Sequence, residues 1–216
     1  MKKITWLSAA LLVATTSATH AESVFEGFSG NVGVAYQNYN TEFSNFRSQN
    51  GTVFNIAPDE STGAVGKLGL DYAWFLSPIT NISVGATYST NYGSAKPITI
   101  TRPDGTVVPD DGTMKMKQKM SIYVAPGLLI NESTLAYVKL GYTNIDSQDE
   151  TATVYGTSAY SYGVGGKFAL DNKSFAYVEA NYLAGKKSNF VSATSGSTFT
   201  IKPTGYELVV GYGFKF

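Results

Sequence analysis

The lysines of this chain are spaced so that several of them could act together. In the segment "MKMKQKM", Lys115, Lys117 and Lys119 occupy every second position. Side chains two residues apart point to the same face of an extended strand, so these three ammonium groups would lie on one surface. Such a row could attract anions, or it could be neutralised by carboxylates on neighbouring elements. Its chemistry therefore depends on the elements that surround it.

Residues that commonly perform acid–base or metal chemistry are scarce. The single histidine is His20, and the chain contains no cysteine. Removal of an N-terminal signal peptide, argued below, would remove this imidazole. Acid–base work would then fall to carboxylates, lysine or tyrosine, which is less common, although spacing alone leaves a glycosidase-like carboxylate pair open. The sequence therefore predicts no enzyme, and we identify no catalytic, cofactor-binding or metal-binding residue in it.

The N-terminal segment is typical of a secretory signal peptide. Lys2 and Lys3 precede an apolar run that ends near Ala14, and small residues follow it. The apolar run is too short to span a bilayer. We expect residues 1–21 to be cleaved and residues 22–216 to form a single domain. Removing the two lysines from the 16 basic residues leaves 14 against 16 acidic ones, a near-neutral balance that argues against a nucleic-acid partner.

Alternation of apolar and polar residues indicates strands in the rest of the chain. In "FSGNVGVAY", the residues Phe28, Val32, Val34 and Tyr36 are separated by small or polar residues. This period of two is typical of a strand with one apolar and one polar face. The predicted strand segments are 28–36, 64–75, 82–90, 114–130, 136–144, 160–170, 176–182 and 206–216.

The two faces and the connections favour a membrane barrel over a soluble sandwich. The polar faces carry mostly Gly, Ala, Ser, Thr and Asn with single charges, which suits a crowded barrel interior, so the apolar faces would meet lipid. Short connections such as 131–133 alternate with long ones such as 38–62, as in outer-membrane barrels. We predict an all-β, eight-stranded antiparallel transmembrane β-barrel with up-and-down topology, short periplasmic turns and four longer extracellular loops. A further hairpin around Asp104 and Gly105 leaves ten spanning strands as an alternative.

Aromatic residues fall at both ends of the predicted strands. If both termini are periplasmic, the tyrosines gather toward the outer rim, at Tyr36, Tyr88, Tyr142, Tyr160, Tyr182 and Tyr206. Toward the periplasmic rim lie Phe28, Trp74, Phe168, Phe214 and Phe216. Two aromatic girdles are expected where a barrel crosses the two membrane interfaces.

Charged residues of the polar faces would line the lumen of this barrel. The expected lumen charges are Lys67, Asp71, Lys117, Lys119, Lys139, Lys167, Glu179 and Glu207. A buried charge needs a partner or water, so these residues could form an ion-paired plug. A surplus of lysine would instead favour the passage of anions through a narrow lumen. Lysines at the outer rim could also hold lipopolysaccharide phosphates.

The predicted loops contain further candidates for interaction. Phe43, Phe46 and Phe54 are apolar residues that no lipid would cover, and exposed apolar clusters often mark binding surfaces. Packing of the loops against one another would hide these residues equally well. Lys186 and Lys187 could bind lipopolysaccharide phosphates or could form a solvated basic loop.

The amphipathic segments and the terminal sequence "YGFKF" together resemble the small eight-stranded outer-membrane β-barrel family, which includes the OmpA transmembrane domain, the OmpX/Ail group and opacity-protein-like surface antigens. The resemblance implies an integral outer-membrane location in a Gram-negative cell, surrounded by lipid and lipopolysaccharide. It also implies that the barrel-assembly machinery recognises Tyr212, Phe214 and Phe216. By analogy with the family, we expect a monomeric surface protein whose loops contact a host or surface ligand, with a role in adhesion or envelope integrity. A narrow passive channel for small solutes or anions is the alternative.

Overall fold

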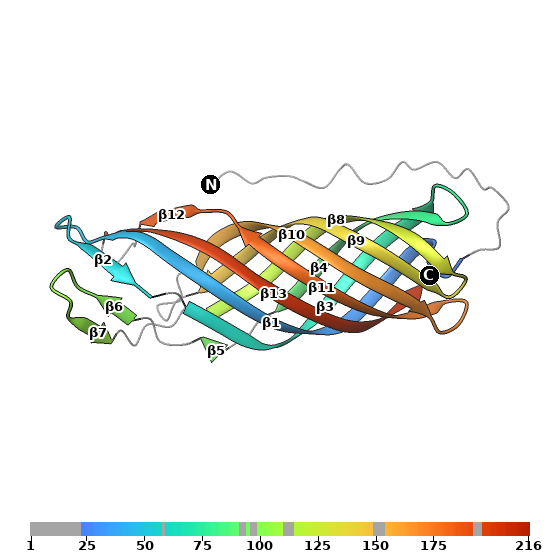
Figure 1. Ribbon diagram of the computed structural model, residues 1–216, viewed down its shortest axis with the longest axis horizontal. Coiled ribbons are helices and arrows are strands. Elements are labelled where there is room, and N and C mark those ends of the chain that lie inside the picture. Colours follow the sequence, from blue (N-terminus) through green and yellow to red (C-terminus); the bar gives the residue numbers. More distant parts are fainter. Residues whose placement is uncertain are drawn as a thin grey trace.

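A ring of eight long antiparallel strands forms the body of the protein (Figure 1). The computed structural model describes residues 23–57, 59–90, 94–95, 99–109, 115–148, 154–191 and 196–216, so the predicted signal peptide lies outside the described residues. The long strands are β1 (Gly27–Arg47), β3 (Asp59–Phe75), β4 (Thr80–Thr90), β8 (Lys115–Asn131), β9 (Thr134–Gln148), β10 (Val154–Ala169), β11 (Ser174–Gly185) and β13 (Thr198–Lys215). Pairing of β13 with β1 closes the ring, which confirms the predicted eight-stranded barrel.

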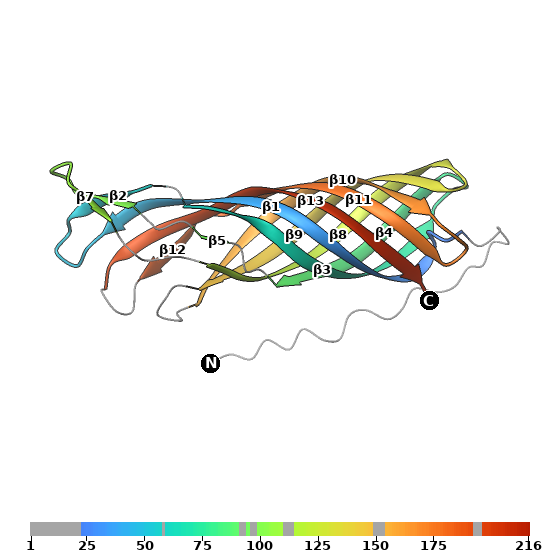
Figure 2. The same cartoon turned by 90° about the horizontal axis from the view of Figure 1, so that it is seen from below.

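Short strands gather at one end of the ring, here called the loop end (Figures 1 and 2). They are β2 (Val53–Ile56), β5 (Ser94–Ala95), β6 (Thr99–Thr101), β7 (Val107–Pro109) and β12 (Ser188–Val191). The β6–β7 hairpin turns at Gly105, whose φ of 84° is left-handed, and it pairs with β2. This hairpin therefore projects from the loop end, and the spanning ring has eight strands rather than ten.

Tight connections occupy the opposite end of the ring, here called the turn end. Strands β3 and β4 are joined through Leu76–Ile79, β8 and β9 through Glu132 and Ser133, and β10 and β11 through Leu170–Lys173. The last residue, Phe216, lies at the same end, where its backbone N–H donates to the carbonyl of Phe28 at 3.0 Å. The short turns lie where the sequence predicts them. At the loop end, the connections from β1 to β3, from β4 to β8 and from β11 to β13 contain additional short strands, whereas only residues 149–153 separate β9 from β10, because both strands extend into the loop predicted over 145–159.

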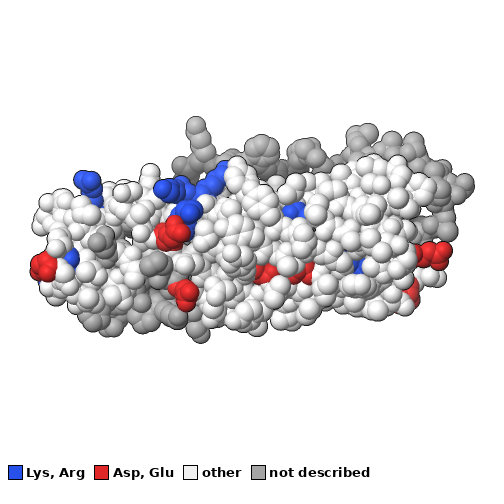
Figure 3. Space-filling view, in the orientation of Figure 1, with Lys and Arg blue, Asp and Glu red and all other residues white. Residues whose placement is uncertain are grey.

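The strands expose their large apolar residues outward and bury their small or polar residues inward, which is the reverse of a soluble protein. On β1, Val34 and Tyr36 are 56% and 58% exposed, whereas the inward residues Ala35 and Gln37 are 0% and 1% exposed. On the face seen in Figure 3, much of the wall between the two ends accordingly shows no Lys, Arg, Asp or Glu. Among the described residues, no helix has the length and apolar character to cross a membrane. The outward side chains instead provide a continuous apolar band, as expected for a barrel in lipid.

Glycines on the inward face make room for large rings from neighbouring strands. Tyr137 lies over Gly165, and a Cβ added to this glycine would lie 2.5 Å from the Tyr137 hydroxyl and 2.8 Å from the Val178 carbonyl oxygen. Tyr123 covers Gly85 in the same way, at 2.6 Å. An eight-stranded barrel has an interior only wide enough for its side chains, so each inward ring requires a small residue beside it. This packing explains the many small residues on the polar faces.

We expect Gly165→Val to destabilise the folded barrel by about 1–3 kcal/mol, because overpacking forces the Tyr137 ring out of its site. The matched control is Gly66→Val, since Gly66 faces outward and a Cβ there would meet no atom within 4 Å. The control should leave stability unchanged or slightly higher, because valine favours strands over glycine. Urea unfolding in lipid vesicles measures both changes, and equal effects of the two substitutions would contradict the packing argument.

The turn between β10 and β11 is stabilised by the carboxylate of Asp171. The Ser174 hydroxyl donates to it at 2.6 Å, and the backbone N–H groups of Lys173 and Ser174 donate at 2.7 Å each. The hydrogen bond from the Ser174 hydroxyl, followed by that from the Lys173 N–H, lowers the pKa of Asp171 below its usual value. A lowered folded-state pKa stabilises the protein above the unfolded-state pKa, and this stabilisation is lost as the pH falls through the folded-state pKa.

Asp171→Asn should therefore lower the urea midpoint at pH 7, and the difference from the wild type should shrink as the pH falls below about 4. Glu132→Gln is the matched control, because it removes one negative charge from the neighbouring turn, where Asn131 accepts the hydrogen bonds of Ser133. A difference between wild type and Asp171→Asn that stays constant from pH 7 to pH 3 would contradict this role of the carboxylate.

Candidate functional site

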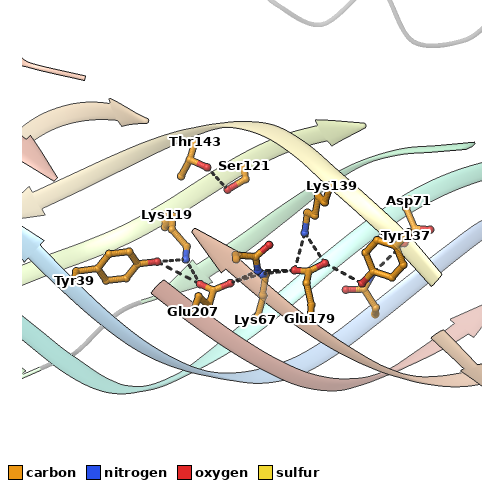
Figure 4. Close-up of polar contacts among 12 residues, drawn as sticks. Tyr39, Lys67, Asp71, Lys119, Ser121, Tyr137, Lys139, Thr143, Glu179 and Glu207 are labelled. Atoms are coloured by element: carbon orange, nitrogen blue, oxygen red, sulfur yellow. Dashed lines mark hydrogen bonds and ion pairs between the residues drawn. The ribbon is translucent and has the colours of Figure 1, made fainter. Parts of the chain in front are cut away.

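A chain of buried ion pairs fills the middle of the lumen (Figure 4). Its first centre is Glu207 on β13, which is 4% exposed. Lys67 of β3 donates to one carboxylate oxygen at 2.5 Å, and Lys119 of β8 pairs with the other. The Tyr39 hydroxyl accepts from Lys119 at 2.6 Å and lies 3.4 Å from the same carboxylate. Three strands that are not neighbours in the ring are thus connected through side chains in the lumen.

The second centre is Glu179 on β11. Its two oxygens accept from the Lys139 ammonium group at 2.9 and 3.0 Å, and Lys67 reaches it at 3.3 Å. The Tyr137 hydroxyl and the Asn181 amide add hydrogen bonds of 3.0 and 2.8 Å. Lys67 therefore bridges the two glutamates and joins these two centres into one group of ion pairs.

A third centre lies toward the turn end. Asp71 on β3 accepts from Lys167 at 3.0 Å, from the Ser29 hydroxyl at 3.0 Å and from the Asn31 amide at 3.1 Å. The three centres bring together four lysines and three carboxylates, which leaves one positive charge in excess within this network. Each carboxylate is satisfied by several donors, as a charge removed from water requires.

Apolar layers seal the network on both sides. Phe25, Leu135 and Phe175 belong to a buried cluster near the turn end, and Ile145 and Leu183 belong to a second cluster nearer the loop end. Because these layers limit the access of water, attraction between the ions inside is stronger than it would be at a surface.

The spaces that remain around the network are small. Two cavities of about 20 Å³ each flank Lys67, and each has room for about one water molecule. Buried polar atoms without a protein partner include the Gln37 amide and the hydroxyls of Ser161 and Tyr177. Such atoms are normally satisfied by internal water. Around Lys67, the described part of the lumen is therefore packed with side chains and leaves room for single water molecules.

The prediction that Lys117 lies in the lumen is wrong, because its side chain is exposed. The pairing of β8 with β9 shifts between Met116 and Gln118, so Lys117 is the extra residue of a β-bulge. A bulge leaves its extra residue outside the regular alternation. Beyond it the alternation resumes, and Lys119 points inward.

The aromatic loop candidates pack against one another at the loop end. The Phe46 ring lies 5.7 Å from that of Phe54 and 6.1 Å from that of Phe199. Phe43 and Phe46 are only partly buried, against a cluster that includes Tyr155. This arrangement corresponds to the self-packing alternative. Lys186 and Lys187 lie between β11 and β12 and are exposed.

The C-terminal aromatic residues lie on the outward face of the turn end. Tyr212, Phe214 and Phe216 are 45%, 43% and 75% exposed, and this placement suits residues that contact lipid near a membrane interface. Their recognition by the assembly machinery stays a prediction.

The sequence interpretation did not include three polar residues of the network, which are Tyr39, Tyr137 and Asn181. Each lies an even number of positions from an inward residue of its own strand, so alternation along the strand could have identified them. Among the described residues, no group of three or more His, Cys, Asp or Glu side chains is arranged to hold a metal ion. The arrangement can stabilise and close the lumen.

Glu207→Gln should destabilise the barrel by about 3–5 kcal/mol, because it leaves Lys67 and Lys119 buried without their shared counter-ion. Glu42→Gln is the matched control, since Glu42 pairs with Lys202 at 3.3 Å while 52% exposed. An exposed pair contributes at most about 1 kcal/mol. Urea unfolding in vesicles measures both, and a loss at Glu207 no larger than that at Glu42 would show that the lumen behaves as open water.

Comparison with known proteins agrees with this architecture. Similar solved structures include Neisserial surface protein A, with 14% identity, a TM-score of 0.52 and coverage of 88% of this chain and 98% of that chain. OprG from Pseudomonas aeruginosa has 10% identity, a TM-score of 0.53 and coverage of 91% and 99%. The outer membrane protease OmpT from Escherichia coli has 9% identity, a TM-score of 0.52 and coverage of 93% and 100%. At these identities the likeness concerns the fold alone.

The family is shown by the sequence itself. No curated protein matches the chain, but the profile of the outer membrane protein β-barrel domain matches residues 7–214. The closed ring, its apolar outer wall and its polar, ion-paired lumen are the features that such a barrel needs in a bilayer. The chain therefore belongs to the outer membrane protein β-barrel domain family and is an integral protein of the outer membrane.

Proposed function

We propose that the protein is a closed, non-enzymatic barrel whose loop end is its extracellular end, and that it acts through this end in adhesion to surfaces and in envelope integrity. The observation that carries this proposal is the ion-paired lumen, which makes transport an unsuitable task for the barrel. The function is then left to the parts that rise above the membrane.

The lumen network supports a closed barrel. Passage of a solute would require Lys67 to leave Glu179 and Glu207, all three of which are buried. Breaking a buried pair by removing one partner costs about 3–5 kcal/mol, and the network contains several such pairs. The two cavities beside Lys67 have volumes of about 20 Å³ each, which is room for about one water molecule.

The extracellular end is large enough to carry an interaction. On β13, residues 198–205 precede the girdle residue Tyr206. At about 3.3 Å per residue and a tilt of about 40°, they raise the barrel roughly 20 Å above the girdle. The outward residues there are polar and include the Glu42–Lys202 pair, and the small sheet of β2, β6 and β7 extends from this rim. The rim thus offers strands and charges to an external surface.

A narrow anion channel is the second candidate, favoured by one observation. The network contains four lysines and only three carboxylates, and an excess of positive charge in a pore selects anions. Catalysis is not part of either candidate, because the only histidine is His20, within the predicted signal peptide.

Planar-bilayer recording of the refolded protein separates the two candidates. We expect no discrete openings over many insertions in a salt gradient, because the buried ion pairs stay closed. Folding of the protein before its addition to the bilayer is verified by the change in electrophoretic mobility on boiling that a folded barrel shows. Anion-selective openings that disappear in Lys119→Glu would overturn the closed-barrel proposal in favour of the channel.

A separate experiment measures how strongly cells that produce the protein adhere to polystyrene and to a cultured epithelial layer. Replacing Thr99–Pro109 with a short Gly-Ser turn should reduce adhesion severalfold, because it removes the projecting hairpin. The matched control replaces the periplasmic turn Asn131–Ser133 with Asn-Gly and should leave adhesion unchanged. Equal adhesion of the wild type and the hairpin variant would contradict a role for this part of the extracellular end.

A further inference from the structure

The outer wall of the barrel contains an open cavity with both polar and apolar lining near the loop end. The cavity has a volume of about 520 Å³ and is lined by residues of β8, β9 and β10, together with Ser188 of β12. Its lining includes Gln118, Met120, Tyr142, Asn144, Asp146 and Ser158. These residues occupy the outward positions of their strands, whereas their neighbours Lys119, Thr143 and Ile145 are buried in the lumen. The cavity therefore faces the membrane side and not the pore.

The outward residues of β9 fix the height of this cavity. Val138 and Leu140 are about half exposed and belong to the apolar band. Tyr142 follows them, and its ring packs edge-to-face with that of Tyr160, 6.0 Å away. Asn144 and Asp146 come next. Since tyrosines gather where acyl chains meet headgroups, the polar lining of the cavity begins at the level of the outer-leaflet headgroups.

Lys186 holds a positive charge at the edge of this cavity. Its backbone N–H donates to the Ser158 carbonyl at 2.8 Å. Its ammonium group lies 4.5 Å from the ring centroid of Tyr160 and 5.1 Å from that of Tyr142. A hydrogen bond with the Tyr160 hydroxyl raises the pKa of Lys186 above its usual value, so the ammonium form persists. Charged side chains gather over the β12 region of the surface (Figure 3).

The other groups of the cavity suit a ligand with several hydroxyls. The Gln118 amide donates to Asp146 at 2.6 Å, and its oxygen lies 3.4 Å from the Tyr88 hydroxyl. These contacts hold Asp146 in place, and a carboxylate retains further acceptor sites after one such bond. Met120, 54% exposed, borders the cavity on the side of the apolar band. Polar groups at this depth lose water and need hydrogen-bonding partners from lipid headgroups.

We propose that this cavity binds the phosphorylated sugar headgroup of an outer-leaflet glycolipid. The Lys186 ammonium group binds the phosphate, the lining groups Asn144, Asp146 and Ser158 hydrogen-bond the sugar hydroxyls, and Met120 contacts the first methylene groups of an acyl chain. The rings of Tyr142 and Tyr160, over which the Lys186 ammonium group lies, hold this group at the edge of the cavity. The site does not depend on the proposed role of the extracellular end, because it requires only the position of the barrel in the membrane.

The position and charge of the cavity favour a lipid over a protein or a free anion. A protein partner would have to displace the lipids that surround this wall. A free anion would be repelled by Asp146 as well as attracted by Lys186. A phosphorylated sugar instead places its phosphate at Lys186 and donates a hydroxyl hydrogen bond to Asp146. A headgroup also arrives with acyl chains that cover the apolar residues below, Val138 and Leu140.

The test is a lipid titration of the folded, full-length protein in detergent micelles, with bound lipids counted by native mass spectrometry. The probes are a bis-phosphorylated, acylated glucosamine disaccharide and phosphatidylglycerol. We expect the wild type to bind the glycolipid at least tenfold more tightly than phosphatidylglycerol. Lys186→Ala should weaken glycolipid binding about tenfold, because a charge-assisted hydrogen bond is lost. Lys187→Ala removes the same charge from the next residue and should change binding by less than about twofold.

A second variant tests the sugar contacts without changing the charge. Asn144→Leu combined with Ser158→Leu fills the cavity with apolar side chains and should abolish the preference for the glycolipid over phosphatidylglycerol. Both positions face outward, so the electrophoretic shift on boiling should stay the same as for the wild type. Equal losses in the two lysine variants, the absence of any preference for the glycolipid, or displacement of the lipid by excess inorganic phosphate would each overturn the proposal.

Discussion

Pairing of β13 with β1 is the interaction on which the rest of this structure depends. Seventeen residue pairs join the two strands, from Ser29 with Lys215 to Arg47 with Thr198. Without this pairing the sheet would present two unpaired edges to lipid. In a bilayer each unsatisfied backbone group costs several kcal/mol, so closure is a requirement rather than a preference. Closure also decides which side chains are hidden, because a closed sheet has an inside that lipid cannot reach.

With eight strands, that inside has a width set by side chains. Small inward residues such as Gly165 leave room for rings such as that of Tyr137, and the ionic groups must then find partners within the same narrow space. Lys67, shared between Glu179 and Glu207, is the consequence of having several carboxylates and lysines at one level. The network therefore stabilises the closed lumen and blocks it with the same contacts.

The strands of the ring could be predicted from the sequence. Alternation of residues such as Val34, Ala35 and Tyr36 has a period of two, which places the large apolar residues on one face of the sheet and the small or polar residues on the other. Pairing inside the lumen could not, since Lys139 and Glu179 lie on strands separated by β10 and only the closed ring brings them together. Lys117 was misplaced for a related reason: a bulge depends on the register with the next strand, which alternation within one strand does not reveal.

In this barrel the apolar side chains face outward and the polar side chains face inward, so a polar group on the outer wall is an exception that needs an explanation. Inside the lumen, Lys139 finds its partner on another strand of the ring. On the outward side of the same strand, Asn144 is exposed at the headgroup level, where its further partners have to come from lipid or water. In the closed barrel that we propose, contact between this protein and its surroundings occurs at the wall and the rim. Specific recognition by such a protein is therefore expected where strands leave the apolar band, and the cavity beside Lys186 lies at that boundary.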